Sequence, residues 1–77
     1  VYARLMQLED QRYFSPEEFH SFLITSHAGI RRRAAIAIGR IGDPRGLQTL
    51  FDLLVDDGNP TVRATAAFAI GEIEYPD

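Results

Sequence analysis

The chain contains one short pattern twice. Residues 34–41 read AAIAIGRI, and residues 66–73, which lie 32 positions later, read AAFAIGEI. A period between about 20 and 50 residues is typical of stacked structural repeats, in which each unit buries its apolar face only against its neighbours. The repeat therefore predicts an array of similar units rather than one domain around a single core.

The composition limits how such an array is stabilised and what it binds. The 77 residues include no cysteine, so disulfides and thiolate metal sites are excluded. The net charge of −3 argues against general nucleic-acid binding, which depends on clustered Lys and Arg. No apolar run approaches the roughly 20 residues of a membrane-spanning helix. The chain begins with Val1 and ends where a further repeat is expected, which predicts that it is part of a longer protein.

Helix-start and helix-stop signals predict five helices. Ser15-Pro16, Asp43-Pro44 and Asn59-Pro60 each join a capping residue to a proline suited to the first turn. Glu18 sits where a capping box needs a carboxylate, and Gly42 is placed to end a helix in the left-handed conformation. The expected helices span about residues 1–12, 15–26, 30–41, 43–55 and 59–73, with a break at 27–29. Short connections favour antiparallel neighbours.

The repeat divides these helices into units of two, called A and B. Residues 1–14 form a lone B-like helix, residues 15–42 the first unit and residues 43–77 the second. Gly39 and Gly71 lie within the B helices, where Gly costs about 1 kcal/mol relative to Ala. Their recurrence predicts a close helix crossing, and a shared point of bending is the alternative. Six alanines also predict close approach of flanking helices: Ala34, Ala35, Ala37, Ala66, Ala67 and Ala69.

The segment from Pro60 to Ile73, followed by a proline turn, resembles a HEAT repeat. Together with residues 30–45, it is most similar to the short, alanine-rich kind named after the phycobilisome (PBS) bilin lyases. The resemblance covers about residues 15–77. It implies an all-α, right-handed α-solenoid, with B helices on the concave face and A helices on the convex face. Most members of the family are scaffolds or binding surfaces for other proteins.

Positions that stay fixed between the two units are interpreted as structural, namely Arg31 with Arg63 and Gly39 with Gly71. Each arginine is expected to reach a carboxylate or carbonyl in a turn between units, because its planar fork suits bidentate contact. The carboxylates available for this are Asp43, Asp56 and Asp57. The alternative is that residues 31–33 form a basic patch for an acidic partner or a phosphate. Successive helical residues point about 100° apart, however, which opposes one flat patch.

Positions that differ between the units share one face of the B helices. Its partly polar character predicts that this face lies at the concave surface. Phe68 is a candidate anchor for a partner, because aromatic and Arg side chains dominate interface hot spots. The alternative is that Phe68 packs on a following repeat. The candidate partner-binding residues are Arg32, Ile36, Arg40, Phe68 and Glu72.

No sequence motif indicates catalysis, a metal or a cofactor. His20 and His27 flank a helix break without a carboxylate that completes a ligand set. Neither is followed by Glu, unlike the histidines of the HEAT-repeat deoxyhypusine hydroxylases. The turn at residues 56–59 lacks the spacing of a calcium loop. We therefore predict a non-catalytic protein-interaction or scaffold module without cofactors.

Several alternatives remain open at this point. The parent protein could be an enzyme such as a bilin lyase, or this chain could be the accessory arm of a larger enzyme. Some bacterial peptidyl-prolyl isomerases carry similar repeats. Nucleic-acid binding is disfavoured, because Arg40 in one unit is replaced by Glu72 in the other. The expected partner is another protein, and the uncovered last B helix also predicts self-association through repeat ends, or marginal stability.

Overall fold

The computed structural model describes residues 1–76 and contains five α-helices, with no strand among these residues. In chain order they are α1 (Tyr2–Gln11), α2 (Pro16–Leu23), α3 (Ala28–Ile41), α4 (Gly46–Asp56) and α5 (Pro60–Glu74). The predicted all-α class and helix number are confirmed. Asp77, the last residue of the second predicted unit, lies outside the described residues.

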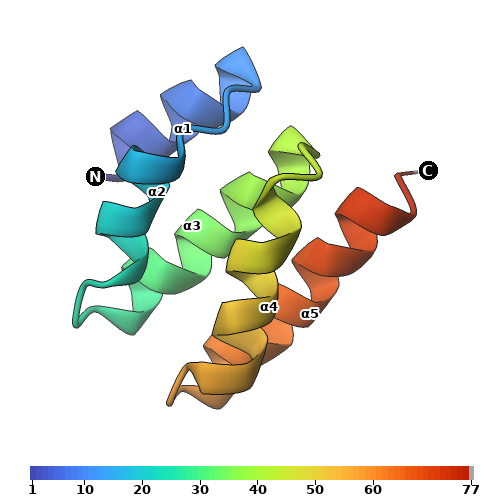
Figure 1. Ribbon diagram of the computed structural model, residues 1–77. Helices are drawn as coiled ribbons and strands as arrows, with labels where there is room; N and C mark the ends of the chain where they lie inside the picture. The colour runs from blue at the N-terminus through green and yellow to red at the C-terminus, as the bar shows by residue number, and fades with distance from the viewer. Residues whose placement is uncertain (77) are drawn as a thin grey trace.

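The helices form two layers (Figure 1). Helices α1, α3 and α5 lie side by side in one layer, and α3 makes its most extensive contact with α5. In the other layer, α2 packs on α3 and α4 packs mainly on α5. The lone first helix therefore occupies the place of a B helix, as the sequence predicted. The result is two A–B helix pairs stacked as an α-solenoid, with α1 added at one end.

Two of the predicted helix starts are confirmed in detail. The Ser15 hydroxyl accepts a hydrogen bond from the Glu18 backbone N–H, and the Asn59 side-chain oxygen accepts from the N–H groups of Thr61 and Val62. These caps satisfy donors that have no partner within the helix. The capping-box half of the prediction is wrong, because the Glu18 carboxylate binds the guanidinium of Arg4 in α1.

Other predicted boundaries need correction. Helix α2 ends at Leu23 and does not reach Ser26, and α3 already begins at Ala28, inside the expected break. The predicted start at Asp43-Pro44 is also wrong, because α4 begins at Gly46. The Asp43 carboxylate accepts the N–H of Arg45 two residues on, at 2.9 Å, and so closes a turn before the helix. Gly42 ends α3 with φ 77°, as predicted.

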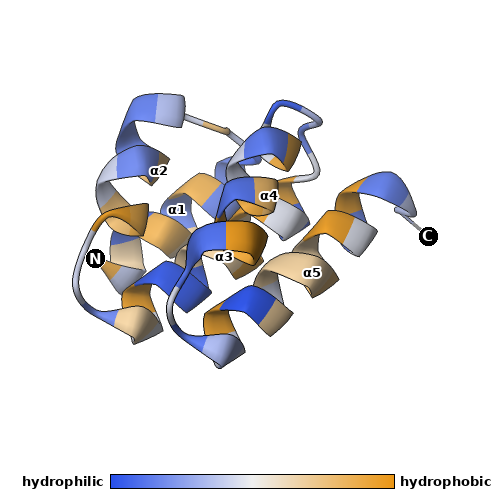
Figure 2. Cartoon of the chain, turned by 60° about the horizontal axis from the view of Figure 1, so that its bottom comes forward, coloured by the Kyte–Doolittle hydropathy of each residue, from blue (hydrophilic) through white to orange (hydrophobic). Residues whose placement is uncertain are grey.

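The core lies between the two layers. In the view of Figure 2, apolar and polar residues alternate around the helices. Five of the six repeated alanines are fully buried, whereas Ala67 is exposed, so it does not mediate the close approach that the sequence predicted for it within this chain. The buried apolar residues are Leu5, Leu8, Phe14, Phe19, Ala34, Ala35, Ala37, Ile38, Ile41, Leu50, Leu53, Val62, Ala66, Ala69 and Ile70.

Candidate partner-binding surfaces

A hollow of about 400 Å³ lies between α3 and α5 and is called the α3–α5 groove here. Its lining residues come from these two helices alone: Arg32, Ile36, Arg40, Thr61, Ala64, Thr65, Phe68 and Glu72. All five residues that the sequence comparison selected for partner binding are among them. They meet because equivalent positions of stacked repeats lie on the same face of neighbouring helices.

Phe68 is the most accessible large apolar side chain of this groove, with 68% of its surface exposed. Ile36 faces it from α3 and is half-buried. Ala64 is the equivalent of Arg32 in the second unit, and the sequence comparison placed both on the variable face. The sequence reasoning missed Thr61 and Thr65, which precede Phe68 by seven and three residues, so helical spacing alone would have placed them on its face.

The charged residues of the α3–α5 groove have different environments. Arg32 is exposed, whereas an Arg40 guanidinium nitrogen lies 3.1 Å from a carboxylate oxygen of Glu9 in α1. Arg33 contacts the other oxygen of Glu9 at 2.8 Å. Burial acts to raise the pKa of Glu9, but the hydrogen bonds from the two arginines outweigh it and hold the pKa below its ordinary value. Arg40 is thereby held in place at the edge of the groove.

The two repeated glycines have unequal surroundings. A Cβ atom added to Gly39 would lie 2.8 Å from the Ala69 Cβ, 2.9 Å from the Ala69 Cα and 2.8 Å from the Glu72 Oε1. At Gly71 an added Cβ would have nothing within 4 Å among residues 1–76, apart from the backbone of its own helix and its chain neighbours. Helices α3 and α5 thus approach each other most closely at Gly39, while the equivalent place on α5 is open.

The repeated arginines also differ. Arg31 donates from Nε and Nη2 to the carboxylate oxygens of Asp57 at 2.8 and 3.1 Å, and from Nη1 to the Thr25 carbonyl at 2.9 Å. Arg63 repeats only the carbonyl contact, donating to the Asp57 carbonyl at 2.7 Å. Its hydrogen bonds with Arg31 lower the pKa of Asp57 below the ordinary range, and the same bonds raise the pKa of Arg31.

The run of arginines at 31–33 does not form one basic patch. Arg31 turns to Asp57 in the turn before α5, Arg33 turns to Glu9 in α1, and Arg32 borders the α3–α5 groove. Each of the three therefore faces a different part of the molecule, as the 100° step of a helix requires.

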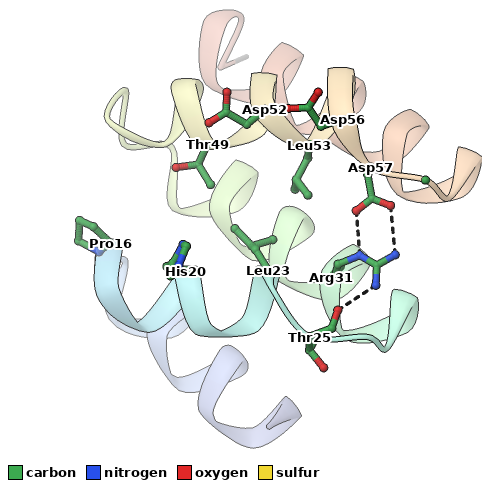
Figure 3. Close-up of a pocket in the computed structure, with 11 residues that line it drawn as sticks. Pro16, His20, Leu23, Thr25, Arg31, Thr49, Asp52, Leu53, Asp56 and Asp57 are labelled. Atoms are coloured by element: carbon green, nitrogen blue, oxygen red, sulfur yellow. Dashed lines mark hydrogen bonds and ion pairs between the residues drawn. The ribbon is translucent and has the colours of Figure 1, made fainter.

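A second groove, of about 490 Å³, lies between α2 and α4 (Figure 3). The sequence reasoning did not identify it. Pro16, His20 and Leu23 line it from α2, and the Arg31–Asp57 ion pair closes one end. The remaining lining residues are Thr25, Thr49, Asp52, Leu53, Asp56 and Gly58. It is called the α2–α4 groove below.

A third, more polar hollow of about 820 Å³ lies beside the C-terminal ends of α1, α3 and α5. It shares Arg40 and Glu72 with the α3–α5 groove and also includes Asp10, Arg12 and Tyr75. The two hollows therefore adjoin on the layer of α1, α3 and α5.

The two histidines occupy separate places. His20 lines the α2–α4 groove, and His27 precedes the first turn of α3. Among residues 1–76, no three His, Cys, Asp or Glu side chains are grouped closely enough to hold a metal ion. Within the same residues, no helix has the length and apolar character needed to cross a membrane.

Comparison with known proteins supplies one match. A family model of HEAT repeats matches residues 17–77, which include α3 to α5 and all of α2 except its first residue, Pro16. No curated protein and no solved structure shows significant similarity to the chain.

Proposed function

Because the chain belongs to the HEAT-repeat family, whose members generally mediate protein–protein interactions or scaffolding, we propose that it is a non-catalytic protein-interaction module that binds a partner protein through the α3–α5 groove. Its alanine-rich B helices support placement in the short, PBS-lyase-type subclass. The proposal rests above all on one observation: the positions that differ between the two units line a single groove.

The composition of this groove suits protein recognition. It combines an exposed aromatic ring, an aliphatic side chain and two arginines, and aromatic and Arg side chains are enriched among hot-spot residues. Ile36 and Phe68 offer apolar contact on opposite helices, and Arg32 offers an exposed guanidinium for a carboxylate or carbonyl of the partner. Backbone ordering on binding is small, since both walls are helices already packed together.

Selection of peptides from a random phage-displayed library against the immobilised chain tests this proposal. Peptides that use the groove are expected to bind Phe68→Ala at least about 30-fold more weakly, the effect of removing a hot spot of about 2 kcal/mol. Phe51→Ala is the matched control, because Phe51 is also an exposed aromatic but lies on α4, outside the groove. Equal binding to the wild type and Phe68→Ala would refute the proposal, and so would equal losses in both variants.

A further inference from the structure

The α2–α4 groove belongs to the layer of the molecule that the proposed function does not use. Its volume of about 490 Å³ is within the range of roughly 300–1,000 Å³ typical of ligand pockets. Helices α2 and α4 rest on α3 and α5 and make at most marginal contact with each other, so the space between them is not filled by the chain's own side chains.

The groove has an apolar floor. Leu23 projects from the end of α2 and Leu53 from the last turn of α4, and Figure 3 shows their side chains between the two helices. Leu53 is buried and Leu23 half-buried, so only part of this apolar surface is covered within the chain. An aliphatic group placed between them would gain contact on both sides.

The rim of the groove on α4 is acidic. Asp52 and Asp56 lie one helical turn apart, about 6 Å along the axis, and both are exposed. Asp52 accepts a hydrogen bond from the Gln48 side chain at 3.0 Å. Among residues 1–76, neither carboxylate forms an ion pair. Both carboxylates, which lie on the same face of α4, are thus available to pair with a cationic group of another molecule.

The cationic groups that line the groove do not neutralise this rim. All three of the Arg31 nitrogens Nε, Nη1 and Nη2 are engaged, two by Asp57 and one by the Thr25 carbonyl (Figure 3). His20 is the other basic residue of the lining, and it stands on the opposite wall, on α2. The three carboxylates of the groove therefore face a single guanidinium that is already paired.

We propose that the α2–α4 groove is a second docking site, which binds a basic segment of a partner protein. Lysine or arginine side chains of the segment pair with Asp52 and Asp56 at the rim, and an aliphatic side chain packs on the leucine floor. Charge complementarity selects the cation, and the apolar floor distinguishes a peptide from a small cation without apolar groups. This site shares no lining residue with the α3–α5 groove, so each proposal can fail without the other.

Fluorescence anisotropy with a labelled, capped peptide of alternating arginine and leucine tests the proposal on the intact chain. The double variant Asp52→Asn/Asp56→Asn preserves side-chain shape and is expected to bind the peptide about fivefold to tenfold more weakly, as the loss of two exposed ion pairs implies. A peptide of alternating glutamate and leucine is expected not to bind. Affinity for the arginine peptide is expected to fall as salt screens the charges.

The double variant Asp10→Asn/Glu74→Gln is the matched control, because it removes the same net charge from exposed positions outside the groove. It is expected to bind the peptide as the wild type does, and thermal melting followed by circular dichroism verifies that both double variants are folded. Equal weakening in the two double variants would overturn the proposal, because binding would then follow net charge alone. Displacement of the peptide by an equal concentration of spermidine would overturn it too, since spermidine cannot use the apolar floor.

Discussion

The repeated glycines allow a direct test of the helix crossing, because the same substitution meets two different environments. Gly39→Ala places a methyl group within 3.0 Å of two atoms of Ala69 and of the Glu72 carboxylate. The Glu72 side chain can rotate away. Ala69 cannot, because its Cβ and Cα are fixed by the backbone of α5. Relief therefore requires α3 and α5 to move apart by several tenths of an ångström.

The magnitude follows from two opposing contributions. Alanine improves helix propensity by about 1 kcal/mol over glycine. Overpacking a tight contact costs about 1–3 kcal/mol, and the upper part of this range applies where backbone atoms are involved. Gly39→Ala is therefore expected to lower the free energy of unfolding by about 1–2 kcal/mol. In a domain of this size that corresponds to a fall in Tm of roughly 5–15 °C.

Gly71→Ala is the matched control, since among residues 1–76 its methyl group meets no atom of another helix within 4 Å and the propensity gain remains. It is expected to raise the Tm by a few degrees, or about 0.5–1 kcal/mol. Urea unfolding followed by circular dichroism gives both free energies, and measurement at two protein concentrations separates stability from association. If both variants were stabilised equally, the crossing would not be the reason for the glycine at position 39.

Three further predictions concern the repeated arginines, the carboxylate of Asp57 and the face of α5 that bears Gly71. Arg31→Gln is expected to lower the free energy of unfolding by about 1–3 kcal/mol, because it removes a bidentate, charge-assisted contact with Asp57, whose side chain is 4% exposed. Arg63→Gln removes only a contact with a carbonyl oxygen and is expected to lower the free energy of unfolding by less than half as much. The pKa of Asp57 is lower in the folded state than its usual value of 3.8, so its stabilisation is complete above that value and lost as pH falls through the folded pKa. The stability difference between the wild type and Asp57→Asn, measured by urea unfolding, is therefore expected to be largest near neutral pH and to shrink below about pH 4. Sedimentation velocity is expected to show that the chain self-associates as its concentration rises. Ala67 is exposed on α5, so Ala67→Glu is expected to reduce this association without lowering the Tm. A wild type that stays monomeric at high concentration would contradict the prediction.

The sequence predicted features that depend on period and on neighbouring residues. The 32-residue repeat identified the stacked helices, and comparison of its two copies selected five residues that share a groove. Caps such as Asn59, which act within one turn, were also predictable. These features follow from helix geometry, which a single sequence encodes directly.

Most contacts between distant segments were not predictable. The repeat did indicate that Arg31 reaches a carboxylate in a turn, and Asp57 was one of three candidates. The local rule assigned Glu18 to a capping box, but Arg4 lies close enough in space to bind it instead. The ion pairs of Glu9 with Arg33 and Arg40 likewise join residues more than 20 positions apart. The α2–α4 groove depends on how far two short helices stand from each other, and no residue pattern specifies that distance. The period of the sequence thus indicates which helix faces are equivalent in the two units. The width of the grooves between helices is known only from the structure.

The face of α5 that bears Gly71 is equivalent to the face of α3 that packs against α5, so the contacts of α3 show what a helix covering α5 would contact. On α3, Gly39 contacts Ala69 of the next B helix, and Arg31 receives the Asp57 carboxylate from the turn before that helix. Among residues 1–76, no other helix comes within 4 Å of a Cβ added at Gly71 of α5, and Arg63 keeps its carbonyl contact but has no carboxylate partner. These differences between α3 and α5 all lie on the helix face that, in α3, packs against the next B helix. Self-association is expected because a second copy that covers this face buries the small-residue surface, and a carboxylate brought near Arg63 would complete the contact that Arg31 already makes.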